Sequence, residues 1–444
     1  MAKYKIINGE GIIPNGTTEF EYNAFKMSSK LKSITIPESV TKIGDHAFEW
    51  CEELESTTIP NSVTKTGKGA FKMSGLRNIT IPNSVTEICD GAFCGCKKLT
   101  SINIPNSVTE IGAWAFSWCE ALTSINIPNS VTKIGEGAFN GCEKLTSINI
   151  PNSVTEIGEK AFSGCKALTS INIPNSVTKI GAWAFPECKA LTSINIPESV
   201  TEIGEGAFAG CYALTSIIVA EGNKVYDYRG NCNAIIETKT NRLIQGCTNT
   251  VIPESVTEIG DHAFYACETM TSINIPNSVT KIGKSAFWWC EALISINIPE
   301  SVTEIGAGAF SKCTALTSVN IPDSVTEIGD FAFRWCEALT SINIPNSVTK
   351  IRDFAFRWCE ALTSINIPDS VTEIGRWAFD GCENLKEIIL YQTDPSKIKV
   401  TESSGLQKTQ ATLYVPNEGV AAFQKDSFWS EFAAIKPITD DMLK

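Results

Sequence analysis

The sequence predicts an α/β repeat solenoid, in which short parallel strands alternate with turns or short helices. A phrase of 23 residues, close to LTSINIPNSVTEIGxxAFxxCxx, recurs along almost the whole chain of 444 residues. One coil buries too little apolar surface to offset the entropy of ordering its backbone, so neighbouring coils must stack. The repeat therefore predicts one elongated body instead of several globular domains. The Phe of an Ala-Phe pair marks fifteen copies, at positions 25, 48, 71, 93, 116, 139, 162, 185, 208, 264, 287, 310, 333, 356 and 379.

The copy that begins at Leu99 illustrates the first strand of each coil. Leu99, Ile102 and Ile104 alternate with Ser101 and Asn103, and this period of two places the apolar and polar groups on opposite faces. We expect the apolar side chains to point into the solenoid and the Ser and Asn columns to point out.

The rest of the coil follows in order. Residues 105–107 (Pro-Asn-Ser) end the first strand, because proline lacks a donor and Asn and Ser favour turns. Val108 and Ile111 belong to a second extended stretch, and Gly112 turns the chain. Cys89 and Arg352 replace this glycine in other copies, so the turn is not expected to require a positive φ. The last apolar residues then follow at one-turn helical spacing: Ala115, Phe116, Cys119 and Leu122.

Most of the seventeen cysteines occupy one repeat position, three residues after the Phe. Ser28 and Ser74 stand there in other copies, which is typical of a small buried site. We therefore interpret the column as small buried hydrophobes, with disulfides between adjacent coils or metal binding as the alternatives. Zinc-type CxxC spacing is absent and only two histidines are present. No cofactor and no metal site is expected.

The charge of the chain disfavours several classes of partner. Its net charge is −12 and it contains no run of Lys or Arg, which disfavours nucleic acid and anionic membranes. No segment reaches the roughly 20 apolar residues of a membrane span, so membrane insertion is not expected. The first residues lack the apolar core of a secretory signal. Either the protein is cytosolic, or a signal peptide has been removed from an extracellular or cell-surface protein.

Two columns of side chains are candidates for recognition. The first lies around the Ala-Phe pair, where Trp, Tyr and Arg, the types that dominate binding hot spots, replace one another. Stacking between coils explains these residues equally well. The candidates there are Trp288, Trp289, Phe331, Arg334, Trp335, Phe354, Arg357, Trp358 and Trp377.

The second candidate is the Asn column of the strand face. Its identical side chains suit a periodic partner such as a glycan, held by avidity, or they form hydrogen-bonded amide ladders with a structural role. The candidates of the first block are Asn103, Asn126, Asn149, Asn172 and Asn195. A further column, just before the second inward Ile, carries charges that mostly alternate in sign, as Glu110 and Lys133 do. We interpret it as scaffolding.

The spacing of Leu, Ile, Pro, Gly, Ala-Phe and Cys in IPxSVTxIGxxAFxxCxxL resembles the BspA-like leucine-rich repeat family, over about residues 12–390. The resemblance implies a curved right-handed solenoid with a parallel sheet on its concave face and short helices or turns on the convex side. It also implies a surface protein that adheres to host proteins or cells. The expected divisions are 1–12 (start of an N-terminal cap), 13–214 (first block), 215–251 (irregular coil with insert), 252–390 (second block) and 391–444 (C-terminal cap).

The insert lengthens one repeat by 33 residues between Phe208 and Phe264. Two β-prone runs, 231–237 and 242–245, flank a polar tetrapeptide and predict a hairpin. Within this insert, residues 221–248 either pad a joint or form a recognition element.

The sequence offers no nucleophile motif or phosphate loop, and rows of like groups do not make a catalytic centre, so no enzyme is expected. We expect a non-catalytic interaction protein that binds a protein or polysaccharide at a cell surface. The alternatives are a self-assembling structural protein and a cytosolic scaffold.

Overall fold

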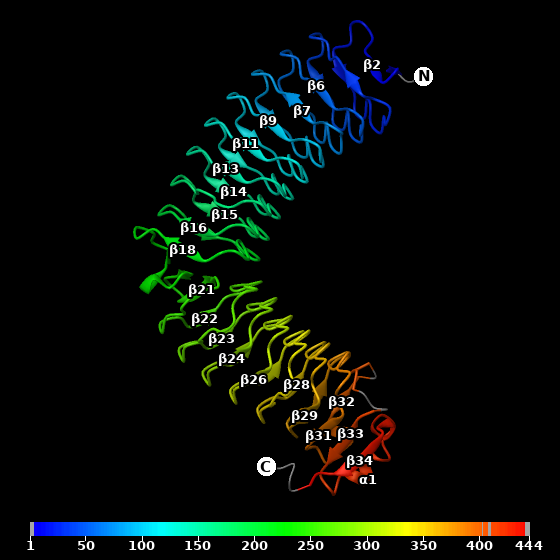
Figure 1. The fold of residues 1–444 in the computed structure, drawn as a ribbon, viewed down its shortest axis with the longest axis vertical. Coiled ribbons are helices and arrows are strands. Elements are labelled where there is room, and N and C mark those ends of the chain that lie inside the picture. The colour runs from blue at the N-terminus through cyan, green and yellow to red at the C-terminus, as the bar shows by residue number, and fades with distance from the viewer. Residues whose placement is uncertain (1–3, 402, 407–409, 440–444) are drawn as a thin grey trace. The chain divides into compact units, whose positions relative to one another are not determined.

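The computed structural model describes residues 4–401, 403–406 and 410–439. It is a parallel-strand solenoid in which most coils contribute two short strands, one to each of two rows (Figure 1). The chain divides into two compact units, residues 1–227 and 228–444, where the repeat had predicted one body. The two units are described separately.

Unit 1 begins with an antiparallel pair and continues with parallel strands only. In the first row, Ser124 of one strand lies beside Ser101 and Ser147 of its neighbours. The first-row strands, with the antiparallel β1, are β1 (Lys5–Ile7), β2 (Glu10–Ile12), β4 (Ser33–Ile34), β6 (Ser56–Thr58), β7 (Asn78–Thr80), β9 (Ser101–Asn103), β11 (Ser124–Asn126), β13 (Ser147–Asn149), β16 (Ser193–Ile196) and β18 (Ser216–Val219). The others are β3 (Glu19–Phe20), β5 (Lys42–Ile43), β8 (Glu87–Ile88), β10 (Glu110–Ile111), β12 (Lys133–Ile134), β14 (Glu156–Ile157), β15 (Lys179–Ile180), β17 (Glu202–Ile203) and β19 (Tyr226–Asp227).

Unit 2 begins with the predicted hairpin, in which β20 (Ile235–Glu237) pairs antiparallel with β21 (Arg242–Gln245). The second hairpin strand then joins the second row in parallel register. That row continues through β22 (Glu258–Ile259), β23 (Lys281–Ile282), β25 (Glu304–Ile305), β27 (Glu327–Ile328), β28 (Lys350–Ile351), β30 (Glu373–Ile374) and β32 (Lys399–Val400). The first row contains β24 (Ser295–Asn297), β26 (Ser318–Asn320), β29 (Ser364–Ile367), β31 (Glu387–Leu390), β33 (Thr412–Val415) and β34 (Ala434–Pro437). Short helices complete the unit: η1 (Arg229–Asn231), η2 (Pro395–Lys397), α1 (Val420–Phe423) and η3 (Trp429–Glu431).

Each solenoid unit has a core of identical columns. Phe139, for example, is fully buried and stacks on Phe116 and Phe162 at centroid distances of 5.5 and 5.4 Å. The backbone N–H of Phe139 also donates to the Ala161 carbonyl of the next coil, at 2.8 Å. Side-chain stacking and a coil-to-coil hydrogen bond therefore coincide at the same residue.

The cysteine column lies beside the Phe column and is buried, as predicted. All seventeen cysteines are free thiols, so the disulfide alternative is wrong. The Cys165 thiol, for example, donates to the Phe139 carbonyl of the preceding coil at 3.3 Å. The Phe139 carbonyl also accepts from the backbone N–H of Cys142 at 3.2 Å, so the thiol is a second donor that ties this carbonyl to the next coil.

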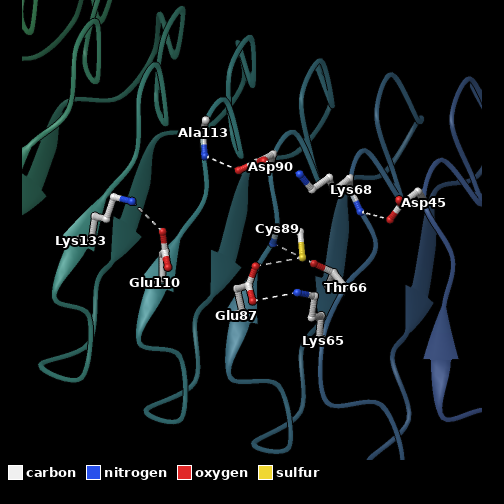
Figure 2. A network of polar contacts seen from close by, with 10 residues as sticks. All are labelled: Asp45, Lys65, Thr66, Lys68, Glu87, Cys89, Asp90, Glu110, Ala113 and Lys133. Atoms are coloured by element: carbon white, nitrogen blue, oxygen red, sulfur yellow. Dashed lines mark hydrogen bonds and ion pairs between the residues drawn. The ribbon is translucent and has the colours of Figure 1, made fainter.

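The predicted charge column forms ion pairs between neighbouring strands. Figure 2 shows Lys65 beside Glu87 and Lys133 beside Glu110, at 3.0 and 3.1 Å. A second ladder runs next to it, in which the Asp90 carboxylate accepts from the Ala113 backbone N–H at 3.0 Å. These exposed pairs each contribute a few tenths of a kcal/mol, which fits a scaffolding role.

The segment around each Ala-Phe pair is a series of turns. The one-turn spacing of its apolar residues in the sequence had allowed either a short helix or turns. In the copy at Phe116, the N–H groups of Cys119 and Leu122 donate to carbonyls three residues earlier, which accounts for the spacing. The residues two before and two after the Phe have a positive φ in every one of the fifteen copies, including 57° at Trp114 and 59° at Trp118. Two left-handed residues four apart cannot belong to a right-handed helix.

The repeat glycine after the second Ile does not have a positive φ, in agreement with the sequence. A Cβ built on Gly135 would lie 2.7 Å from the backbone nitrogen of Ala113 in the preceding coil. Close approach of two backbones therefore favours glycine at this turn.

Thiol reactivity tests the buried cysteine column. We expect a thiol reagent to modify Cys94, which is only partly buried, before the other cysteines of the native protein. Burial raises the pKa of the Cys165 thiol to about 12, and the thiolate is the form that reacts. Native and guanidinium-denatured protein would be alkylated and the sites mapped by mass spectrometry. Rapid modification of Cys165 before unfolding would contradict this packing.

The left-handed positions can be tested with glycine. Glu187 is exposed and has a φ of 55°. We expect Glu187→Gly to raise the free energy of unfolding by about 0.5–1 kcal/mol, because glycine adopts this conformation without strain. Ala190→Gly, at an ordinary negative φ, is the matched control and should lower it by a similar amount. Chemical denaturation measures both, and equal destabilisation by the two changes would count against the left-handed turn.

Candidate interaction surface

Unit 2 brings together seven of the residues singled out from the sequence. We call them the aromatic surface: Phe331, Arg334, Trp335, Phe354, Arg357, Trp358 and Trp377. They come from three consecutive coils, between β27 and β32, and each is half-buried or exposed. Five occupy the left-handed positions on either side of a core Phe, and the two arginines directly follow that Phe.

The aromatic rings of this surface form two short columns. Phe331 stacks on Phe354 with ring centroids 4.6 Å apart, and Phe354 contacts Trp377 at 5.0 Å. Trp335 stacks on Trp358 at 5.1 Å with an interplanar angle of 13°. The stacking holds the rings in one arrangement, so little side-chain entropy remains to be lost on binding.

The two arginines lie between the aromatic columns but differ in their partners. The Arg357 guanidinium lies 5.5 Å from the Phe354 ring and 5.7 Å from the Trp358 ring. Its Nε also donates to the Asp380 carboxylate at 2.8 Å. Arg357 is therefore neutralised within its own unit.

Arg334 has the equivalent aromatic neighbours one coil earlier but no carboxylate partner. Its guanidinium lies 5.6 Å from the Phe331 ring and 5.9 Å from the Trp335 ring. Its Nε is buried and has no acceptor in the part of the chain that the structure describes. Burial, and secondarily the positive charge of Arg357, lowers the pKa of Arg334. The geometry thus presents a partly desolvated, unpaired cation between two rings.

Trp288 and Trp289 lie two coils earlier and are half-buried. The indole N–H of Trp289 donates to Glu291 at 2.8 Å. Sequence reasoning missed Lys312, whose ammonium lies 4.4 Å from the Trp289 ring and 5.7 Å from the Trp335 ring. Lys312 lies two residues after a repeat Phe, the same repeat position as Trp289 and Trp335. This shared position was the signal in the sequence that could have identified it. It extends the cationic and aromatic character beyond the aromatic surface.

Other tryptophans have a structural explanation. Where a Trp at a left-handed position is followed one coil later by Gly, its ring lies over that glycine. A Cβ built on the glycine would meet the indole at 2.3 to 2.9 Å in the pairs Trp114–Gly137, Trp118–Gly141, Trp183–Gly206 and Trp358–Gly381. These four rings cover glycines, whereas Trp335, Phe331 and Phe354 are each followed by another aromatic ring.

The five asparagines named from the first block lie in unit 1, on the strand face. All are exposed, and their side chains make no hydrogen bond to one another or to other described residues. Only the backbones pair, as between Asn126 and Asn149. The amide ladder, one of the two interpretations of this column, is therefore wrong. The exposed amides remain available to water or to a ligand.

These features define a class, the parallel-strand repeat proteins that carry their variable residues on the surface. The profile of the BspA type leucine rich repeat region (6 copies) matches residues 9–123, 109–233, 236–334 and 303–434. The chain belongs to this family.

Solved structures agree with that assignment. A leucine rich cell surface protein from Faecalibacterium prausnitzii is 31% identical, with 89% of this chain and 96% of that chain covered and a TM-score of 0.60. A leucine-rich repeat protein from Bacteroides ovatus is 30% identical, with 90% and 97% covered and a TM-score of 0.54. The pneumococcal vaccine antigen PcpA, 19% identical over 98% and 96%, shares the fold with a TM-score of 0.51. No curated protein sequence matches the chain. Among the described residues, no helix has the length and apolar character to cross a membrane.

The covering role of tryptophan can be tested by a double-mutant cycle. Gly137 has a φ of 56°, and an added Cβ would lie 2.3 Å from the Trp114 ring. We expect Gly137→Ala to lower the free energy of unfolding by about 2 kcal/mol or more, through left-handed strain and overpacking. In a Trp114→Ala background the overpacking disappears, and the cost should fall to about 1 kcal/mol. Additive effects of the two changes would show that the ring does not cover the glycine.

Proposed function

We propose that this protein is a non-catalytic interaction protein that acts at a cell surface, and that a protein partner docks on the aromatic surface of unit 2. Membership of the BspA-type family supports a role in protein interaction. The F. prausnitzii neighbour, described as a cell surface protein, supports the location. The partner is expected to be a host or cell-surface protein, which makes the chain adhesin-like.

The observation that carries the proposal is the unpaired Arg334 guanidinium. A partly desolvated cation costs free energy unless a counter-charge reaches it. A carboxylate from a partner would pair with the half-buried Arg334 guanidinium while neighbouring apolar groups cover the rings of Phe331 and Trp335. The partner therefore presents an Asp or Glu beside aromatic or aliphatic side chains, which is the composition of a hot spot facing Arg and Trp.

The chemistry of the surface also indicates why an acidic partner is selected. The chain as a whole carries a net charge of −12, so an acidic protein is repelled from most of it. Arg334 and Lys312 are cations held against aromatic rings. They create a local attraction on a repelling background, which fixes where the partner docks.

A displayed library of random peptides, panned on the full chain, tests this surface. We expect enrichment of peptides that contain Asp or Glu next to an aromatic residue. Arg334→Gln should weaken the selected peptides by about tenfold or more, because a charge pair in an interface is lost, and Trp335→Ser/Trp358→Ser should abolish binding.

The matched control is Trp114→Ser/Trp118→Ser, which removes two covering tryptophans of unit 1 and should leave the peptides bound. Unchanged peptide binding in the Trp335→Ser/Trp358→Ser variant, with only a lower melting temperature, would reduce the aromatic surface to structural covering. Sedimentation of the chain at rising concentration separates the self-assembling alternative. Growth of ordered oligomers that Trp335→Ser/Trp358→Ser abolishes would show that the partner is a second copy of this chain.

A further inference from the structure

The strand face of unit 2 contains a hollow that is separate from the aromatic surface. It has a volume of about 460 Å³, and its lining residues are Asn343, Ile344, Asn346, Asn366, Pro368, Asp369 and Tyr391. Sites for small molecules have volumes of about 300–1,000 Å³. The hollow is therefore large enough for a ligand of that size, such as one or two sugar rings.

The repeat explains why the hollow forms at this place. Backbone pairing aligns a row of five asparagines in unit 2, which ends at Asn366: Asn274, Asn297, Asn320, Asn343 and Asn366. On the next strand, β31, the buried Ile389 lies opposite Asn366. Two residues later, Tyr391 stands at the position where earlier coils have proline, as at Pro368. The strand after the last amide of the polar row therefore carries an aromatic side chain, Tyr391, two residues beyond the position opposite Asn366.

The polar groups in the hollow are free to bind a ligand. The side chains of Asn343, Asn346 and Asn366 and the Tyr391 hydroxyl make no hydrogen bond to any described residue. Each amide offers two donors and an acceptor, and the Asp369 carboxylate offers acceptors. Adjacent strands lie about 4.8 Å apart, so Asn343 and Asn366 can contact the same ligand.

This set of groups matches the chemistry of a sugar. A hexose carries hydroxyl groups at its edge, each a donor and an acceptor, and C–H groups on its faces. Amides and a carboxylate suit the edge, and a half-buried phenol ring suits a face. Asp369 is the one charged group of the lining, so a sugar that carries a carboxylate or sulfate is disfavoured.

We propose that this hollow binds a hexose unit of an uncharged glycan. Tyr391 stacks on one face of the sugar ring, and Asn343, Asn366 and Asp369 bind its hydroxyls. The rest of the row, towards Asn320 and Asn297, supplies repeated amides along which further sugar units lie, and this repetition adds avidity. The site is independent of the protein-binding surface proposed above.

Unit 1 provides a matched comparison within the same chain. Its asparagine row ends at Asn195, which lies opposite Ile218 of β18. At the position that corresponds to Tyr391, however, unit 1 has Ala220. The amides are therefore present in unit 1 without the ring, and the proposal assigns the sugar to unit 2.

Saturation-transfer NMR with the full chain tests the site. The probes are the methyl glycosides of glucose, galactose, mannose and N-acetylglucosamine, with methyl glucuronide as the charged probe. We expect saturation of at least one neutral glycoside and none of the glucuronide. Tyr391→Ala should weaken the bound glycoside by about tenfold or more, equivalent to the loss of one good contact, whereas Tyr391→Phe, which keeps the ring, should retain most of the affinity.

The amides are tested with Asn343→Ala/Asn366→Ala, which should also weaken binding, against Asn172→Ala/Asn195→Ala of unit 1, which should not. The Trp335→Ser/Trp358→Ser variant should bind the sugar normally, so failure of either site is detected independently of the other. Absence of saturation with every neutral glycoside overturns the proposal. So does equal affinity in Tyr391→Ala, or a preference for the glucuronide.

Discussion

The structure depends on the contact between one coil and the next. Parallel Phe rings repeat along each unit at centroid distances such as 5.1 Å between Phe48 and Phe71, and Phe backbone N–H groups bond the neighbouring coil, as that of Phe48 bonds the Ala70 carbonyl. The cysteine thiols donate to the carbonyls of the same Phe residues one coil earlier. Because the Phe and Cys columns are stabilised by contacts between neighbouring coils, no coil is stable alone, and the side chains that make these contacts have little freedom to vary.

The side chains that do vary lie at the turns. Two left-handed residues flank each Phe, and their side chains are mostly at the surface. A position that tolerates Gly, Trp, Lys, Glu or Phe without disturbing the core is where recognition can change. In unit 2 three consecutive coils place aromatic rings at these positions, with arginines between them. The backbone conformation required for stacking therefore also creates the surface on which the proposed function rests.

Several features of both candidate sites were accessible from the sequence. The 23-residue spacing places Trp335 above Trp358 and Phe331 above Phe354, because every position in a solenoid lies beside its equivalent one repeat later. The same spacing places Asp380 one coil beyond Arg357 and could have identified their ion pair. It places Arg357, a like charge, beyond Arg334. Tyr391 was equally visible as a departure from proline, although its significance depends on the hollow beside it.

The sequence by itself determined the solenoid, the buried columns of Phe and Cys and the hairpin, because these follow from periodicity and from which side chains avoid water. It also carries an unused signal for the turns: no Val, Ile, Thr or Pro occupies the positions two before or two after a repeat Phe. Only the tertiary structure decided that these positions are left-handed, that the asparagine amides remain unpaired and that Arg334 has no acceptor. Those properties depend on backbone angles and on distances of a few ångströms between coils, which residue types and their spacing do not specify.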